Sequence, residues 1–158
     1  MDVIFLDFRT AFHSVPHKRL LEKARSYGNE EPLITWLEAF LTKRHQRVIV
    51  NGAKLDWADI LSGTPQGSVL GPTLFVIFIN DLPASIHSSI QLCADVANVY
   101  GPAFDQALTS VIQKDQDSAM ECSQLWLLPF NLNKCKTLHL MEATSGSHII
   151  RGMQSCGK

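Results

Sequence analysis

Short strand-like runs that alternate with helical segments constrain the fold of this chain more than any other feature. Four runs have the apolar or alternating pattern of strands: Val3–Asp7, Ser89–Leu92, Ala97–Tyr100 and Lys134–Leu140. Tight turns join some of these runs, which argues against a doubly wound sheet of parallel strands only. The 158 residues contain no internal repeat and no linker, so the pattern predicts one α/β unit.

Four segments repeat their apolar residues at helical spacing: Lys18–Tyr27, Glu30–Lys43, Val69–Ile79 and Phe104–Leu127. Gly28 is placed to end the first of them as a C-terminal cap. Pro72 is compatible with the third helix if it falls in the first turn. In the longest helix we expect one buried stripe, formed by Phe104, Leu108, Val111, Ile112, Ala119 and Leu125.

Two hairpins are expected. Asn51-Gly52 strongly favours a tight turn and lies between the runs Gln46–Val50 and Leu55–Leu61. A second turn, Ala94-Asp95-Val96, joins two short apolar runs. The sequence after Met141 shows no period, so we expect residues 141–158 to form a disordered tail.

The charge of the chain is segregated along its length. The net charge is -1, and only 18% of residues are charged, which excludes a disordered acidic or basic tail protein. Residues 9–54 carry nine Lys/Arg against four Glu, whereas residues 55–133 carry one Lys against eight acids. A basic face beside an acidic centre is compatible with a polyanion near a metal site, although such segregation need not survive folding.

Cysteine usage and hydropathy bear on the compartment. The four cysteines form no CxxC pair, which suits a reducing environment. Cys135 and His139 stand four residues apart, but a zinc site would need a second pair of ligands. The longest apolar stretch, Leu74–Ile79, is far shorter than the ~20 residues of a membrane-spanning helix. Acids at positions 2 and 7 interrupt any signal peptide, so we expect a soluble intracellular protein, nuclear or cytoplasmic.

Two aspartates stand out by their positions. Asp7 ends a predicted buried strand, and Asp95 lies at the tip of the second hairpin. Two carboxylates brought together from neighbouring strands repel each other unless a divalent cation lies between them, as in two-metal phosphoryl-transfer sites. The alternative is that both are ordinary turn residues.

The segment Ser62–Pro72 contains three glycines and two prolines and precedes an apolar helix. Such a loop can expose backbone N–H groups where a phosphate or a base approaches. The segment lacks the GK[ST] of a Walker loop and the GxSxG of hydrolases. A plain turn is the alternative.

Five blocks in chain order resemble the palm core of reverse transcriptases from non-LTR (LINE-type, jockey-like) retrotransposons: LDFRTAFHSVPHKRLL, FLTKRHQRVIVNG, LSGTPQGSVLGPTLFVIFINDLP, LCADVANVY and FNLNKCKTLHL. The resemblance covers residues 1–140. It implies an α/β, palm-like antiparallel sheet packed with helices. It also implies an incomplete polymerase, without full fingers and without a thumb.

The resemblance implies template-directed addition of deoxynucleotides by two-metal catalysis. Asp7 and Asp95 match the catalytic aspartates that hold Mg²⁺ or Mn²⁺. The residues that match nucleotide- or template-binding positions are Phe8, Phe12, Pro65, Gln66, Gly67 and Lys134. Phe12 matches the aromatic gate against a ribose 2′-OH, and Lys134 a lysine near the nucleotide phosphates. The implied partners are an RNA template, a DNA primer and a dNTP.

Departures from the family pattern fall within these blocks. Val96 replaces the second aspartate of the hairpin signature, so one ligand charge is lost, and we expect the enzyme to be inactive. Cys93, Ala97 and His13 also differ from the residues usual in the family. The alternative function is a non-catalytic remnant that binds RNA or protein, supported by the basic stretch Lys43–Arg47. A remnant without function is a third possibility.

Overall fold

The chain divides into two compact units. We describe residues 1–101, 106–142 and 148–155 of a computed structural model. The first unit combines Met1–Thr10 with Ile79–Lys158, and the second comprises Ala11–Phe78. The assignment of residues 1–140 to one palm core stays a prediction. No helix in the described ranges is both long and apolar enough to cross a membrane.

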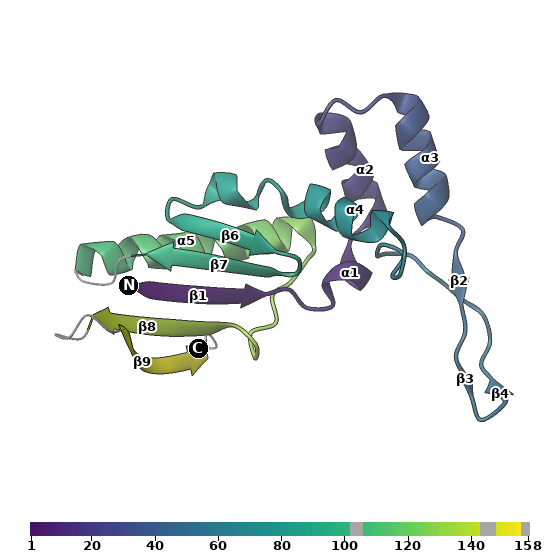
Figure 1. The fold of residues 1–158 in the computed structure, drawn as a ribbon. Coiled ribbons are helices and arrows are strands. Elements are labelled where there is room, and N and C mark those ends of the chain that lie inside the picture. The colour runs from purple at the N-terminus through teal and green to yellow at the C-terminus, as the bar shows by residue number, and fades with distance from the viewer. Residues whose placement is uncertain (102–105, 143–147, 156–158) are drawn as a thin grey trace. The chain divides into compact units, whose positions relative to one another are not determined.

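An antiparallel sheet of five strands forms the body of the first unit, in the order β6-β7-β1-β8-β9 (Figure 1). Its strands are β1 (Asp2–Asp7), β6 (Ser89–Cys93), β7 (Val96–Gly101), β8 (Lys136–Glu142) and β9 (His148–Ser155). Every neighbouring pair of strands is antiparallel. The predicted mixed α/β class with an antiparallel sheet is therefore confirmed.

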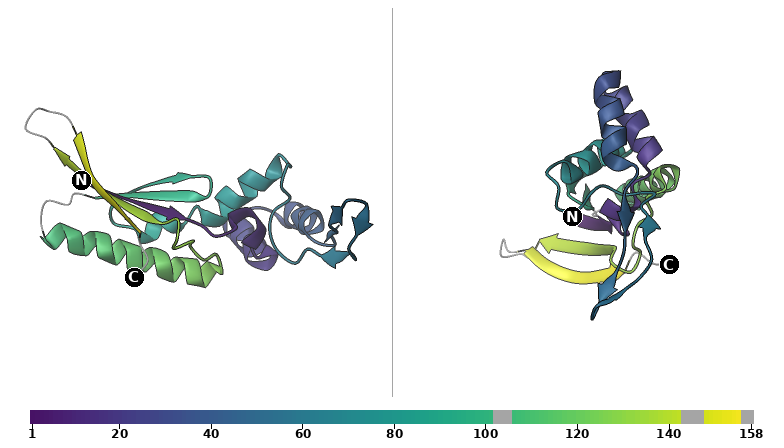
Figure 2. Two further views of the ribbon diagram at one scale, coloured as in Figure 1. Left: turned by 90° about the horizontal axis from the view of Figure 1, so that it is seen from below. Right: turned by 90° about the vertical axis from the view of Figure 1, so that its right-hand side faces the viewer.

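The helix α5 (Gln106–Trp126) runs along one face of this sheet (Figure 2). Cross-strand partners Ile4 and Val99 are buried, as are Leu6 and Ala97. Gly101 lets α5 come close to β7, because a Cβ at this position would lie 2.5 Å from Cδ1 of Ile112. Burial of these apolar side chains is the main term that stabilises the layer.

The buried stripe of α5 differs from the predicted one. Its buried residues are Ile112, Asp115, Ala119, Ser123 and Trp126, spaced three or four apart. Val111 and Leu125 are exposed, and the side chains of Phe104 and Leu108 lie outside the described ones. The prediction counted only apolar residues and so missed a stripe that includes a carboxylate and a hydroxyl.

The described end of the chain contains a strand. Residues 148–155 form β9, which pairs with β8 through seven registered residue pairs, and the expected tail over residues 141–158 stays a prediction. Strand pairing uses backbone groups, so an edge strand can form without the alternating side chains that sequence patterns detect. Residues 143–147 and 156–158 lie outside the described part.

Helices and a hairpin build the second unit. The helices are α1 (Ala11–Ser14), α2 (His17–Ser26), α3 (Glu31–Leu41) and α4 (Leu70–Ile79), whose last residue belongs to the first unit. The helices α2 and α3 pack together, and Leu20 and Leu21 of α2 and Ile34 and Leu37 of α3 are buried. Gly28 has a φ of 82°, as expected for the cap that follows α2. Pro72 lies in the first turn of α4, as predicted.

The hairpin centred on Asn51-Gly52 is confirmed. It contains β2 (His45–Gln46), β3 (Ile49–Val50), β4 (Ala53–Lys54) and β5 (Ala58–Asp59), with β2 paired to β5 and β3 to β4. Asn51 and Gly52 have φ values of 49° and 83°, which suit a type I′ turn. Every residue from His45 to Asp59 is exposed.

Candidate active site

Asp7 is held at the end of β1. Its backbone C=O accepts a hydrogen bond from the N–H of Asn131 at 2.7 Å. In the register of the sheet, Asp7 is directly opposite Val96, the first residue of β7. The side chain of Asp7 is 18% exposed, so its carboxylate is mostly enclosed and open at one side.

Asp95 lies in the turn that joins β6 to β7. Cys93 pairs with Val96, which leaves Ala94 and Asp95 as a two-residue turn, and Ala94 has a φ of 51°. The N–H of Phe8, the residue after Asp7, donates a hydrogen bond to the C=O of Asp95 at 3.1 Å. The backbones of the two predicted metal-binding aspartates are therefore adjacent at one end of the sheet.

Lys134 comes to the same end of the sheet from the other side of β1. Its Nζ lies 3.7 Å from Oδ1 of Asp7, and its side chain is 67% exposed. The turn that carries it is closed by hydrogen bonds from the N–H groups of Lys134 and Cys135 to the C=O of Asn131. The structure thus assembles Asp7, Asp95 and Lys134 in the first unit.

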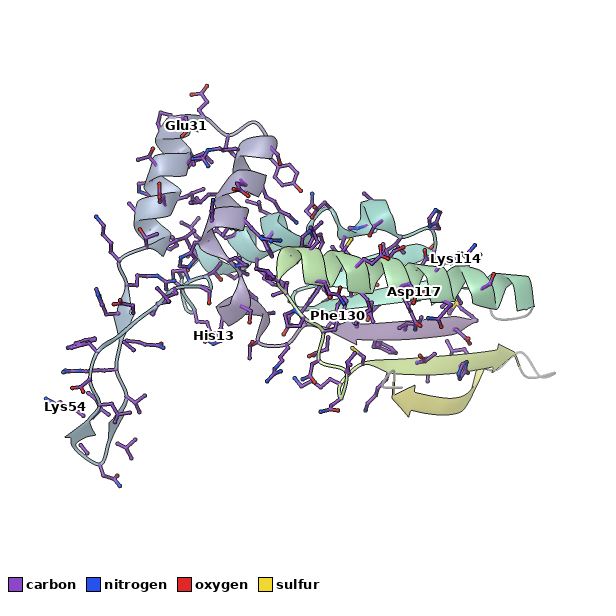
Figure 3. The ribbon with its side chains drawn as sticks, turned by 180° about the vertical axis from the view of Figure 1, so that it is seen from behind. His13, Glu31, Lys54, Lys114, Asp117 and Phe130 are labelled. Carbon is purple, nitrogen blue, oxygen red and sulfur yellow. The ribbon has the colours of Figure 1, made fainter. Side chains whose placement is uncertain are left out.

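The ring of Phe8 is part of the core. Phe8 is 2% exposed, and its ring stacks on Phe130 with centroids 4.5 Å apart. Figure 3 shows Phe130 near the end of β1. The side chain predicted to lie beside a nucleotide is thus buried, and only the backbone of Phe8 can take part in a binding site there.

The other four predicted residues, Phe12, Pro65, Gln66 and Gly67, belong to the second unit. The ring of Phe12 packs on Phe75 with centroids 4.8 Å apart. The N–H of Thr64 donates a hydrogen bond to the C=O of Phe12, so the loop that carries Pro65, Gln66 and Gly67 lies beside it.

Most backbone donors near this loop are already used within the unit. The N–H of Gly63 donates to the C=O of Val15, and that of Ser68 to the C=O of Pro65. The N–H of Gly71, in the first turn of α4, donates to the hydroxyl of Ser68. In the segment that can expose N–H groups to a phosphate or a base, the N–H groups of Gly63, Thr64, Ser68 and Gly71 thus already have acceptors within the unit. Gln66 and Gly67 form its exposed tip.

A pocket of about 470 Å³ adjoins this loop and escaped sequence reasoning. His13, Arg44, Asp59, Thr64 and Gln66 are among its lining residues. Oγ1 of Thr64 is buried without a hydrogen-bond partner. Arg44 donates to the C=O of Gly63 at 2.9 Å, and burial lowers the pKa of its guanidinium. In the sequence, Arg44 was marked only by its place in a basic run, and such a run does not distinguish a partly buried arginine from an exposed one.

Metal-binding capacity is limited in the described ranges. They contain no group of three or more His, Cys, Asp or Glu side chains placed to hold a metal ion. Cys135 is buried, with its Sγ 4.0 Å from the C=O of Asp7, whereas Nδ1 of His139 lies 2.8 Å from Oδ1 of Asp2. Cys135 and His139 thus contact different residues, Asp7 and Asp2.

Comparisons with known proteins agree with the order of the motifs. Residues 2–154 match the family described as reverse transcriptase (RNA-dependent DNA polymerase). The chain is 32% identical over 149 residues to the RNA-directed DNA polymerase from mobile element jockey of Drosophila melanogaster, covering 89% of this chain and 16% of that relative. It is 26% identical over 164 residues to the retrovirus-related Pol polyprotein from type-1 retrotransposable element R2 of Popillia japonica, covering 98% of this chain and 27% of that relative.

Proposed function

Because this chain belongs to the reverse transcriptase (RNA-dependent DNA polymerase) family, as a fragment of the non-LTR retrotransposon kind, we propose that it carries the palm of such a polymerase with a depleted nucleotidyl-transfer centre. The proposed ancestral reaction is addition of a dNTP to a DNA primer on an RNA template. Asp7 and Asp95 are its proposed catalytic carboxylates.

The register between β1 and β7 supports this proposal best. Asp7, Asp95 and Val96 occupy adjacent backbone positions at one end of the sheet, and Val96 is the direct partner of Asp7. Two of the three positions carry carboxylates, and the third carries an isopropyl group that has neither charge nor oxygen. The Nζ of Lys134 supplies a positive charge beside Asp7.

The residues present fit one divalent cation better than two. Carboxylate oxygens are the donors that Mg²⁺ and Mn²⁺ prefer, and Asp7 and Asp95 provide them. Such an ion would supply Lewis-acid activation of a phosphate or hydroxyl oxygen. Two closely spaced cations need more negative charge than these side chains offer. We infer that polymerisation is lost or reduced by orders of magnitude, as follows the removal of a main electrostatic stabiliser.

Replacing Val96 tests this proposal. Val96→Asp restores a charge and Val96→Asn restores only the shape, so the two variants separate electrostatics from packing. Mn²⁺ binding is measured by calorimetry on the whole chain, and primer extension on an RNA template follows. We expect Val96→Asp to bind Mn²⁺ at least about tenfold more tightly than Val96→Asn or the natural chain, since an added carboxylate is an added ligand.

Two results would overturn the proposal. One is equal Mn²⁺ affinity in Val96→Asp and Val96→Asn. The other is primer extension by the natural chain that persists in Asp7→Asn, because Asp7 would then not be catalytic.

A further inference from the structure

The hairpin from His45 to Asp59 contains none of the proposed catalytic residues. All of its residues are exposed, so it has no core of its own. An isolated two-stranded hairpin is marginally stable in water. Several of its exposed side chains are large and apolar: Val48, Ile49, Val50, Leu55 and Trp57. A hairpin with this many exposed apolar side chains is expected to bind a partner.

Cross-strand pairs divide the hairpin into two faces. Nε2 of His45 lies 3.0 Å from Oδ1 of Asp59, and the guanidinium carbon of Arg47 lies 4.5 Å from the ring centroid of Trp57. Ile49 is paired in register with Lys54 near the tip, where Figure 3 labels Lys54. These three pairs follow one another along the hairpin, with a one-residue shift of register between Arg47–Trp57 and Ile49–Lys54, and together they form a row of exposed side chains that includes Arg47, Trp57 and Lys54. We call this the Arg47–Trp57 face.

The opposite face carries no Lys or Arg, and the remaining charged residue of the hairpin is the acid Asp56. Gln46 is paired with Ala58, and Val50 with Ala53. The N–H of Leu55 donates to the C=O of Val48, which places these two residues side by side on the ladder. Nothing on that face attracts a polyanion, so it serves as an internal comparison for the first.

The Arg47–Trp57 face has the chemistry of a base-stacking platform. Trp57 is 63% exposed, and a guanidinium lies over its ring. Exposed aromatic rings stack unpaired bases, and nearby Arg and Lys side chains neutralise phosphates. The segment from Lys43 to Asp59 carries four Lys/Arg against two Asp, and one of these Asp residues contacts His45.

We propose that the Arg47–Trp57 face binds single-stranded RNA, with a base stacked on Trp57 and phosphates beside Arg47 and Lys54. The choice of RNA rests on the proposed function, whereas the location rests on the hairpin alone. Charge complementarity selects a polyanion for this face over an apolar protein surface. The net charge of the second unit as a whole is also positive, with eight Lys/Arg against six Asp/Glu.

The test measures binding of a fluorescein-labelled oligo(U) 15-mer to the whole chain by fluorescence anisotropy, at low and moderate salt. Trp57→Leu should weaken binding about tenfold or more, since loss of one stacked base has that effect. Trp57→Phe should keep most of the affinity. Trp36→Leu is the matched control, because Trp36 is 50% exposed on α3 and stacks on Phe40 outside the hairpin.

Charge variants give an independent readout. Arg47→Gln and Lys54→Gln should each lower the slope of log affinity against log salt by about 0.7, the value for one phosphate contact on a single strand. Val50→Ser, on the opposite face, should leave both affinity and slope unchanged. Circular dichroism should be the same in all variants, because the substituted side chains are exposed.

Several results would overturn this proposal: no binding at low salt, equal losses in Trp57→Leu and Trp36→Leu, or salt slopes unchanged by the charge variants. Self-association abolished by Val50→Ser, without RNA binding, would instead assign the hairpin to a protein contact. None of these outcomes depends on Mn²⁺ affinity. Failure of the RNA platform and failure of the catalytic-centre proposal can therefore be told apart.

Discussion

Two aspartates of the first unit, Asp115 on α5 and Asp7 at the end of β1, show how a structural carboxylate differs from a candidate functional one. The side chain of Asp115 is fully buried, and its oxygens accept hydrogen bonds from the N–H groups of His87 and Ser88, both at 2.8 Å. Asp7 is 18% exposed and faces one exposed ammonium at 3.7 Å. The carboxylate oxygens of Asp115 are therefore used in hydrogen bonds within the fold, whereas those of Asp7 stay accessible to a ligand.

Asp115→Ala should have the largest effect on stability. It leaves two backbone N–H groups in the loop before β6 without their buried acceptor, and hydrogen bonds to charged groups contribute about 1.5–3 kcal/mol. We expect a loss of about 3 kcal/mol in the free energy of unfolding, measured by urea denaturation with fluorescence of the buried Trp126. Asp117→Ala on the same helix is the control, since Asp117 is exposed and should cost little (Figure 3). Equal effects of the two variants would contradict this account.

Low pH should remove the contribution of Asp115 to the free energy of unfolding. Burial alone would raise its pKa, but hydrogen bonds from Ser88 and His87 outweigh it, so the pKa lies below the ordinary value of 3.8. A lowered folded-state pKa means that the stabilisation is fully present above 3.8 and is lost as pH falls through the folded value. The difference in urea midpoint between the natural chain and Asp115→Asn should therefore shrink between pH 5 and pH 2. A difference in urea midpoint that grows on acidification would contradict a lowered pKa for Asp115.

Val96→Asp should destabilise the metal-free chain by about 1 kcal/mol, because like charges directly opposite each other on neighbouring strands repel. Adding Asp7→Asn to this variant should restore most of the loss, which a double-mutant cycle in EDTA would measure. Val96→Asn controls for polarity alone. If the second substitution restored nothing, the two side chains would not share a site.

Lys134→Met should have the smallest effect, at most about 1 kcal/mol, because exposed ion pairs contribute little. Lys136→Met on β8 is a suitable control, as Lys136 is also exposed. A loss as large as that of Asp115→Ala would show that Lys134 stabilises the fold, and the contrast between the two aspartates would fail.

Local chemistry made part of the fold predictable. Asn51-Gly52 specifies its turn because both residues tolerate a positive φ, and Pro72 is compatible with the first turn of α4. The stripe of α5 was mispredicted because Asp115 and Ser123 are polar. Asp115 is buried against the N–H groups of His87 and Ser88, which are remote in sequence, whereas the hydroxyl of Ser123 donates to the C=O of Met120 on the same helix. The separation of residues 11–78 as a unit depends on contacts that no local pattern contains.

The positions of the candidate site residues in the fold were only partly predictable, and their roles stay predictions. Strand ends and a turn indicated Asp7 and Asp95, and the register places their backbones together. The family resemblance implies that Lys134 lies near the nucleotide phosphates, and this stays a prediction. The contact between Lys134 and Asp7 was not predicted from the sequence. The buried ring of Phe8 and the internal use of loop N–H groups depend on Phe130, Val15 and Phe12, which no spacing rule connects to them.

The place of β1 in the sheet has a consequence for the order of events during synthesis. β1 lies between β7, which begins at Val96, and β8, which begins at Lys136. Residues 11–78, by contrast, form a contiguous unit. On the ribosome the second unit is complete before either neighbour of β1 has been made. β1 therefore emerges before its strand partners exist, and we expect closure of the sheet to be a late, long-range and slow step.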